Sequence, residues 1–158
     1  MLKVYHQYSE LNISNLLAVY EDTIKQSQDG RFDAEQDFCD YLRNEFFSMN
    51  GSYYAVWCQD NCYVCALRME PYRDGYLLTG LETAPQARRM GYGTALLNAV
   101  CQSISPVYSH VHRSNRASLR LHRNCGFIEI CDYAMLLDGT VSSQYVTLCF
   151  KHEKPTSN

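Results

Sequence analysis

The sequence predicts a mixed α/β domain with three layers, in which helices cover both faces of one central sheet. Three observations support this fold class: apolar runs of strand length, apolar stripes at helical spacing, and glycine-containing turns between them. Their order is one strand, two helices, three strands, then helix, strand, helix and two strands. With 158 residues and 46% hydrophobic content, the chain is long enough for one core. We expect a single domain over residues 1–152 and a C-terminal tail over 153–158.

The N-terminal third begins with a strand expected over residues 2–8. A helix follows, because apolar side chains recur at the i, i+3, i+4, i+7 spacing of one buried face: Ile13, Leu16, Leu17, Tyr20 and Ile24. Gly30 is expected to end it. A second helix should open at Asp33, which forms a capping-box pattern with Gln36, and carry the inner stripe Phe38, Leu42, Phe46 and Met49. Asn50 and Gly51 close this segment.

The middle of the chain predicts an antiparallel meander of three strands over residues 53–58, 63–70 and 76–83. A glycine turn then leads into a helix ending near Ile104, a strand over 107–112, and a helix over 115–125. The last part, residues 128–137 and 144–151 around Asp138-Gly139-Thr140, predicts a pair of strands.

Composition excludes several functions. The net charge of −3 argues against general nucleic-acid binding, which needs a basic surface. The N-terminus has no signal-peptide core, and no run is long enough to span a membrane, so we expect a cytoplasmic protein. The eight cysteines are scattered and are expected to be reduced. Cys62 and Cys65 have zinc-like spacing, but on a strand they should point to opposite faces, so no metal is expected.

Residues 85–94 form a glycine loop that opens a helix. Gly91 and Gly93 would let backbone amides approach a ligand closely, and the first turn of a helix attracts anions. From Thr83 to Ile128 the chain has six arginines and no Asp or Glu, whereas the rest holds 8 basic and 17 acidic residues. The six are Arg88, Arg89, Arg113, Arg116, Arg120 and Arg123. An anion site is indicated, although an arginine-rich solvated helix face explains part of this pattern.

Two motifs carry a resemblance to a known family. Arg88-x-x-Gly91-x-Gly93 fits a pyrophosphate loop of the form Arg/Gln-x-x-Gly-x-Gly/Ala, and a strand and a proline precede it. The second motif runs from Asn115 through Ser118, Leu121 and His122 to Gly126-Phe127. With both motifs in order, nearly the whole chain resembles the GNAT superfamily of acetyl-CoA-dependent acyltransferases.

The resemblance implies a mostly antiparallel sheet that splays between its fourth and fifth strands and is flanked by about four helices. The pantetheine arm of acetyl-CoA would lie in the splay, with its pyrophosphate on the amides of the glycine loop. The implied cofactor-binding residues are Thr83, Arg88, Arg89, Met90, Gly91, Tyr92, Gly93, Thr94, Asn115 and Ser118. Asn115 also has a simpler explanation as a helix N-cap.

The resemblance further implies two catalytic residues. His122 stands where the family commonly has a tyrosine that protonates the leaving thiolate, and a helical wheel places it half-buried at the edge of the inward face. A structural histidine is an equal alternative. Glu82 is the first choice for the general base, against the alternative of a solvated strand residue. Tyr108 and Tyr133 are reserve proton donors, and His110 and His112 should face the opposite side from Val111.

The expected function is N-acetylation of a primary amine by direct attack on acetyl-CoA, without a metal. The segment from Glu10 to Glu45 has nine acidic and three basic residues, which favours a cationic acceptor. Three further possibilities stay open: a catalytically weak or inactive acetyl-CoA sensor, a homodimer, and, with less support, a nucleotide-hydrolysing P-loop, for which the sequence lacks Gly-Lys-Ser/Thr after the glycines.

Overall fold

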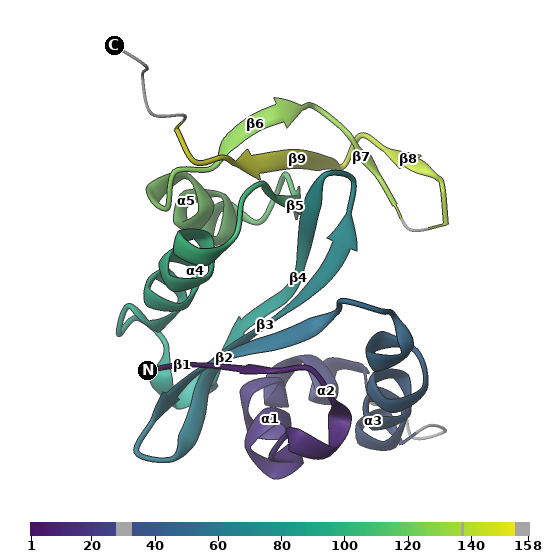
Figure 1. Cartoon of the computed structure of the whole chain (residues 1–158), viewed down its shortest axis with the longest axis vertical. Coiled ribbons are helices and arrows are strands. Elements are labelled where there is room, and N and C mark those ends of the chain that lie inside the picture. The colour runs from purple at the N-terminus through teal and green to yellow at the C-terminus, as the bar shows by residue number, and fades with distance from the viewer. Residues whose placement is uncertain (28–32, 137, 154–158) are drawn as a thin grey trace.

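A computed structural model describes residues 1–27, 33–136 and 138–153 and confirms the mixed α/β class (Figure 1). The sheet has seven strands in the order β1-β2-β3-β4-β5-β9-β6, and β7 and β8 form a separate hairpin. The strands are β1 (Leu2–Tyr5), β2 (Tyr53–Gln59), β3 (Cys62–Tyr72), β4 (Gly75–Thr83), β5 (Val107–His112), β6 (Ile128–Cys131), β7 (Ala134–Met135), β8 (Val141–Ser142) and β9 (Tyr145–Phe150). The α-helices are α1 (Ile13–Val19), α2 (Glu21–Ser27), α3 (Ala34–Asn44), α4 (Tyr92–Ser103) and α5 (Arg116–Asn124).

Helices cover both faces of the sheet. Figure 1 shows α4 and α5 on one face and α1, α2 and α3 on the other. Under α4, Leu96 and Leu97 belong to a buried apolar cluster with Leu67 of β3. On the opposite face, Leu16 of α1 and Leu42 of α3 share a second cluster with β2. The alternation of side chains along each strand therefore supplies both cores.

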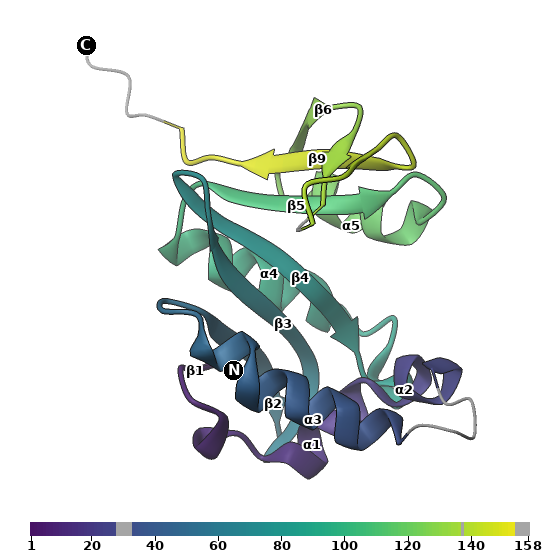
Figure 2. The ribbon, with the colours of Figure 1, turned by 90° about the vertical axis from the view of Figure 1, so that its right-hand side faces the viewer.

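β4 and β5 are the only parallel neighbours in the described sheet, and they pair over a short stretch. Their register ends at Leu78 opposite Ser109, although both strands continue. Beyond this point β4 stays paired with β3, and β5 stays paired with β9. The two strands diverge visibly in Figure 2. This confirms the splay between the fourth and fifth strands of the sheet.

The N-terminal helices differ from the prediction at two points: the first is broken, and the second ends at Asn44, so Phe46 and the 40% exposed Met49 lie beyond it. The helix expected from Ile13 to Ile24 is two helices, because the chain leaves helical geometry at Tyr20. The Tyr20 hydroxyl donates a hydrogen bond to the Gly80 carbonyl oxygen at 2.5 Å, which ties the break to β4. The described residues thus hold five α-helices, not about four. Gly30, the expected end of the first helix, lies outside the described residues.

One half of the predicted capping box, the half made by the Asp33 side chain, is confirmed. The Asp33 carboxylate accepts hydrogen bonds from the amides of Glu35 and Gln36, both at 3.1 Å. The Gln36 side chain donates to Asp40 at 2.8 Å instead of returning to the cap, so the reciprocal half of the predicted box is replaced.

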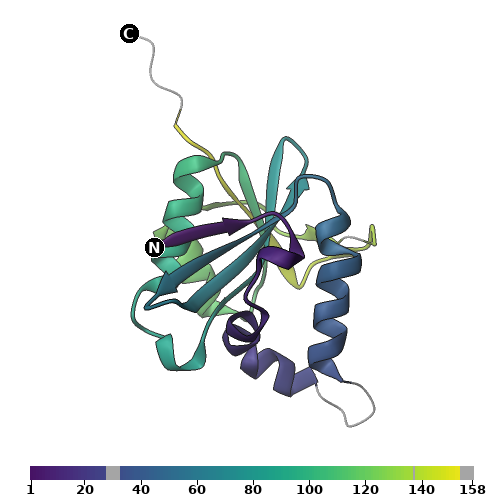
Figure 3. The same cartoon turned by 60° about the horizontal axis from the view of Figure 1, so that its bottom comes forward.

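The edges of the sheet are the N-terminal strand β1 and the strand β6. β1 lies outside β2 at one edge, as Figure 3 shows. At the other edge, β9 lies between β5 and β6, with Ile128 opposite Cys149. The predicted pairing of the last two segments is confirmed for β6 and β9. The predicted continuous strand over 128–137 is wrong, because β6 ends at Cys131 and β7 pairs only with β8.

Candidate active site

The glycine loop joins the end of β4 to α4. After Thr83, a short 3-10 helix (Pro85–Ala87) leads to Gly91, which caps α4 in a left-handed conformation with φ of 83°. The Ala95 amide donates to the Gly91 carbonyl at 3.0 Å, so the amides before Ala95 at the start of α4 have no intrahelical acceptor. They border a cavity of about 270 Å³, lined by Thr83, Ala87, Arg88, Arg89, Gly91, Tyr92, Gly93, Thr94 and Leu121.

The two glycines of this loop serve different purposes. A Cβ on Gly91 would have nothing within 4 Å, so Gly91 is needed for its positive φ. A Cβ on Gly93 would lie 2.9 Å from Leu121 Cδ1 and 3.7 Å from Thr83 Oγ1. Gly93 therefore allows α5 and β4 to approach α4 closely. These free amides and the bare main chain fit a diphosphate group.

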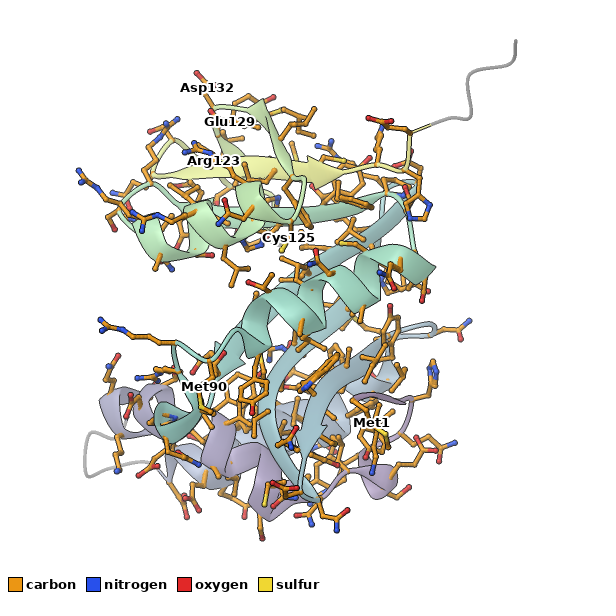
Figure 4. The ribbon with its side chains drawn as sticks, turned by 90° about the vertical axis from the view of Figure 1, so that its left-hand side faces the viewer. Met1, Met90, Arg123, Cys125, Glu129 and Asp132 are labelled. Carbon is orange, nitrogen blue, oxygen red and sulfur yellow. The ribbon has the colours of Figure 1, made fainter. Side chains whose placement is uncertain are left out.

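The two adjacent arginines also differ. Arg88 is held within the protein, because its Nη1 lies 2.7 Å from Asp22 Oδ2 and its Nε donates to the Thr83 carbonyl at 3.2 Å. Arg89 has a positive φ of 62° and no side-chain hydrogen bond or ion pair to another described residue. Met90, beside them, is 63% exposed and lies on the surface of the loop (Figure 4). Of these neighbours, Arg89 is the cation available for a phosphate.

The remaining arginines of the acid-free segment lie elsewhere. Arg123 pairs at 3.9 Å with Glu129, beside it in Figure 4, and Arg113 donates to the backbone carbonyls of Asp132 and Ser143. Arg116 and Arg120 line a surface groove along α5. The predicted anion region is thus divided between the glycine loop and a solvated helix face.

The start of α5 contains the second predicted motif. Asn115 caps the helix through a hydrogen bond from the Ser118 amide to its Oδ1 at 3.1 Å. The Ser118 carbonyl oxygen in turn lies 2.8 Å from His122 Nδ1. This contact assigns the proton to Nδ1 and leaves Nε2 with a lone pair. Asn115, Ser118 and His122 form one chain of contacts, and Leu121 links α5 to the cavity at the glycine loop.

His122 is more deeply buried than the helical wheel predicted. Its side chain is 1% exposed and packs edge-on against Phe127, with 5.0 Å between ring centroids. Its Nε2 has no hydrogen-bond partner in the described part of the chain. Burial lowers the pKa of His122 below its usual value, and the contact with the Ser118 carbonyl opposes this only in part. The imidazole is therefore neutral near pH 7.

Glu82 lies on the face of β4 that α4 and α5 do not cover, and its side chain points toward α2. It is opposite Ala66 of β3, and its Oε1 accepts a hydrogen bond from Thr23 Oγ1 at 2.5 Å. Burial raises the pKa of Glu82, while Thr23 and Arg88 work in the opposite direction. A half-buried carboxylate with a raised pKa, one residue from the cavity-lining Thr83, is suited to accept a proton.

The reserve donors lie away from the glycine loop. The Tyr108 hydroxyl donates to Asp74 at 2.5 Å in the turn between β3 and β4, and this bond raises the pKa of Tyr108 to about 12. Tyr133 is 42% exposed beyond β6. Cys62 is exposed at the end of the β2–β3 pairing, whereas Cys65 is buried. Among the described residues, no group of His, Cys, Asp and Glu is arranged to hold a metal ion.

Three polar residues near the splay were not singled out from the sequence as site residues. Arg68 of β3, Thr79 of β4 and His110 of β5 each have a buried polar atom without a partner among the described residues. His110 and His112 do lie on the opposite face from Val111, as alternation predicts. The signal that could have identified this group is the position where the β4–β5 pairing ends, which depends on long-range register.

Comparison with known proteins agrees with this fold. The model of the acetyltransferase (GNAT) family matches residues 16–127, so the chain belongs to this family. It is accordingly an acyltransferase, and the family uses acetyl-CoA. No match was found among the curated proteins. In the described residues, no helix has both the length and the apolar character needed to cross a bilayer.

Solved structures share the fold at low sequence identity. A ribosomal-protein-alanine N-acetyltransferase from Brucella melitensis is 20% identical with a TM-score of 0.64, and the match covers 96% of this chain and 99% of that one. An aminoglycoside 6'-acetyltransferase type Ii is 12% identical with a TM-score of 0.69, covering 98% and 99%. The PaiA N-acetyltransferase from Thermoplasma acidophilum, solved with coenzyme A, is 11% identical with a TM-score of 0.63, covering 96% and 99%.

Proposed function

We propose that the protein transfers the acetyl group of acetyl-CoA to a primary amine. The observation that carries this proposal is the splay of β4 and β5 beyond Leu78 and Ser109, with the glycine loop at the end of β4. The unpaired strand edges can hold an extended pantetheine arm, and the α4 amides can hold the diphosphate, with Arg89 beside it. Thr83 and Leu121 border the same cavity.

The proposed chemistry is a direct attack. The amine nitrogen forms a bond to the thioester carbonyl carbon, the carbon–sulfur bond breaks, and strand amides stabilise the negative charge on the carbonyl oxygen. Glu82 accepts the proton of the amine, directly or through water. A thioester already carries a good leaving group, so the proposed reaction uses no metal ion.

His122 is proposed to protonate the leaving thiolate through Nε2, the atom without a protein partner. Its lowered pKa means that the protonated form becomes rarer as the pH rises. Rate should consequently fall with rising pH unless water supplies the proton. Asn115 and Ser118 are proposed to position α5, and Ser118 directly fixes the ring of His122.

The acceptor is proposed to approach from the side of α1, α2 and α3. Described carboxylates there include Glu21, Asp22 and Glu35, which favours a cationic amine over an acidic one. The fold neighbours act on diverse substrates by their names, from a ribosomal-protein alanine to an aminoglycoside, so likeness of fold does not select among them.

Thiol release from acetyl-CoA over a panel of amines tests this function, together with calorimetric titration of CoA. Turnover on any primary amine supports it. Tight CoA binding without turnover would instead favour the alternative, an acetyl-CoA sensor, to which the deeply buried histidine in place of tyrosine points. Protein that neither binds CoA nor releases thiol would contradict both.

A cytoplasmic location and a homodimer are further proposals. The exposed edge strand β6 supports the second, because Ile128 is 67% and Ile130 is 41% exposed there. Sedimentation of the purified protein across a range of concentrations tests the dimer.

A further inference from the structure

Unpartnered buried polar atoms gather around the splay. In the described ranges 1–27, 33–136 and 138–153, four buried side-chain polar atoms have no hydrogen-bond partner: Arg68 Nε, Thr79 Oγ1, His110 Nε2 and His122 Nε2. Buried polar groups in native proteins are nearly always paired. Three of these four atoms lie on the neighbouring strands β3, β4 and β5, which indicates a place where a ligand supplies the missing partners.

Register puts these three residues together on one face. Arg68 is directly opposite Thr79 in the β3–β4 pair. Thr79 and His110 are the next residues after the last β4–β5 pair, Leu78 with Ser109. Neighbouring strands lie about 5 Å apart. The three side chains therefore form a row across the start of the splay, on the face of the sheet that α1, α2 and α3 cover, because Ala66, two residues before Arg68, packs into that core.

Arg68 has no direct partner for its charge among the described residues. The buried carboxylate of Glu70 lies two positions along β3 on the same face; burial raises the pKa of Glu70, while Arg68 and the Thr79 hydroxyl oppose that shift. The Arg68 side chain has no hydrogen bond and no ion pair within 4 Å among the described residues, and it lies against the Tyr41 ring, 5.3 Å from the centroid. The guanidinium covers Gly80, where a Cβ would lie 2.9 Å from Nη2. A guanidinium has five N–H donors and accepts nothing, and a partly buried one needs oxygen atoms as partners.

His110 supplies a hydrogen-bond acceptor, which complements the donors of Arg68. It lines a surface groove of about 420 Å³ with Leu77, Thr79, Leu136 and Asp138. Burial, and to a smaller extent Arg73, lowers the pKa of His110, so its ring is neutral near pH 7. Only a neutral imidazole offers a nitrogen lone pair, and a lone pair on the buried Nε2 suits an N–H donor such as an amine.

We infer that the acceptor is an α-amine, a primary amine one carbon away from a carboxylate or carbonyl group, whose oxygen binds Arg68 and Thr79 while its nitrogen lies beside His110. This inference rests on the proposed acetyl transfer. Thr79 is on the strand next to His110, and the long side chain of Arg68 comes from the strand beyond it, which suits two groups of one small ligand separated by two bonds. A long polyamine would leave Arg68 without a partner.

Three matched acceptors test the inference: alanine, an alanine-initiated peptide with blocked side chains and C-terminus, and ethylamine, which is alanine without its carboxylate. Rates are compared per concentration of neutral amine. A hydrogen-bonded charge is worth about 10- to 100-fold in kcat/KM. We expect alanine, the peptide or both to exceed ethylamine by at least about tenfold. If alanine is acetylated faster than the peptide, the group that binds Arg68 and Thr79 is a free carboxylate. If the peptide is acetylated faster, that group is a carbonyl.

Variants at Arg68 and Thr79 test whether these residues cause the preference for an α-amine over ethylamine. Arg68→Met should remove the advantage of the α-amine, measured as the ratio of the α-amine rate to the ethylamine rate in the same protein, so that any change common to both acceptors cancels. Arg68→Lys should retain part of the advantage. Thr79→Val tests the hydroxyl, and Arg120→Met, on the solvated face of α5, is the matched surface control. Thermal melts and CoA titrations identify any variant that misfolds.

The outcomes separate this inference from the proposed function. If ethylamine reacts as well as the α-amines, or if Arg68→Met keeps the preference, the inference is overturned while acetyl transfer stands. If no amine reacts, acetyl transfer fails, and binding decides the inference: alanine or the peptide titrated into the CoA complex should bind to wild type and not to Arg68→Met. Absence of that binding overturns the inference.

Discussion

Gly93 of α4 and Leu121 of α5 are in close contact, since a Cβ on Gly93 would be 2.9 Å from Cδ1 at the flexible end of the Leu121 side chain. This contact joins the two sequence motifs of the family in space. It positions the first turn of α4 and the helix that carries His122 against each other, at the edge of the cavity beside the glycine loop.

Gly93→Ala should weaken CoA binding by displacing Leu121 at the edge of the cavity, with a stability change within about 1 kcal/mol, because the flexible end of Leu121 can turn aside and alanine favours a helix over glycine. The second change Leu121→Ala should recover part of the binding, because it removes the displaced atom. Gly91→Ala is the comparison: it meets no atom within 4 Å but has a φ of 83°, so it should cost about 1 kcal/mol or more of backbone strain. Denaturant unfolding and CoA titration measure both effects. A large, unrescued loss of stability in Gly93→Ala would contradict the assigned contact.

Arg89→Ala should weaken CoA binding by about 3- to 10-fold and reduce its dependence on salt, because Arg89 has no side-chain partner in the described part of the chain and can bind a phosphate. Arg88→Ala should weaken it less, because Arg88 is paired with Asp22 and Thr83. Calorimetry at two ionic strengths compares them. A larger effect for Arg88 would reverse their assignments.

Glu82→Gln should lower kcat by about 100-fold or more, since the general base is lost, while CoA affinity stays unchanged. In the wild type the base must be ionised, so activity should fall as the pH falls through the raised pKa of Glu82. Thr23→Val removes a hydrogen bond that favours the carboxylate, so this acidic limb should move to higher pH. Glu129→Gln, on the distant strand β6, is the control. Near-normal kcat in Glu82→Gln would assign the base to another group.

His122→Tyr should preserve the rate through neutral and alkaline pH, whereas wild type should already lose it as the pH rises through the weakly acidic range. The proposed acid form of His122 disappears as the pH rises through its lowered pKa, whereas tyrosine keeps its proton to about pH 10. His122→Phe keeps a ring and removes the proton donor. Profiles of kcat against pH decide the matter: if all three proteins give the same profile, His122 is structural.

The sequence predicted the elements with local signatures and missed features set by distant partners. The strand Val107–His112 and the start of α4 after Gly91 follow from apolar alternation and glycine placement. The break at Tyr20 depends on its bond to Gly80, sixty positions along the chain, and the insertion of β9 between β5 and β6 depends on strand order. Neither has a local signal.

The candidate site also has a part that the sequence predicted and a part that it did not. The residues of the glycine loop could be predicted because a short motif places them together, and Thr83, Arg89 and Gly93 do border one cavity. The different roles of Arg88 and Arg89 could not be predicted from the sequence, because they depend on the contact of Arg88 with Asp22 in another helix. Arg68 and His110 were not predicted as site residues, because only the register of the strands shows that their polar atoms lack partners among the described residues.

A crystal structure of the complex with CoA tests the central claim most directly. The diphosphate should lie on the amides that open α4 after Gly91, with the pantetheine arm between β4 and β5 beyond Leu78 and Ser109. A diphosphate bound at the α5 arginines, or a pantetheine arm outside the splay, would contradict the assignment of the glycine loop as the acetyl-CoA site.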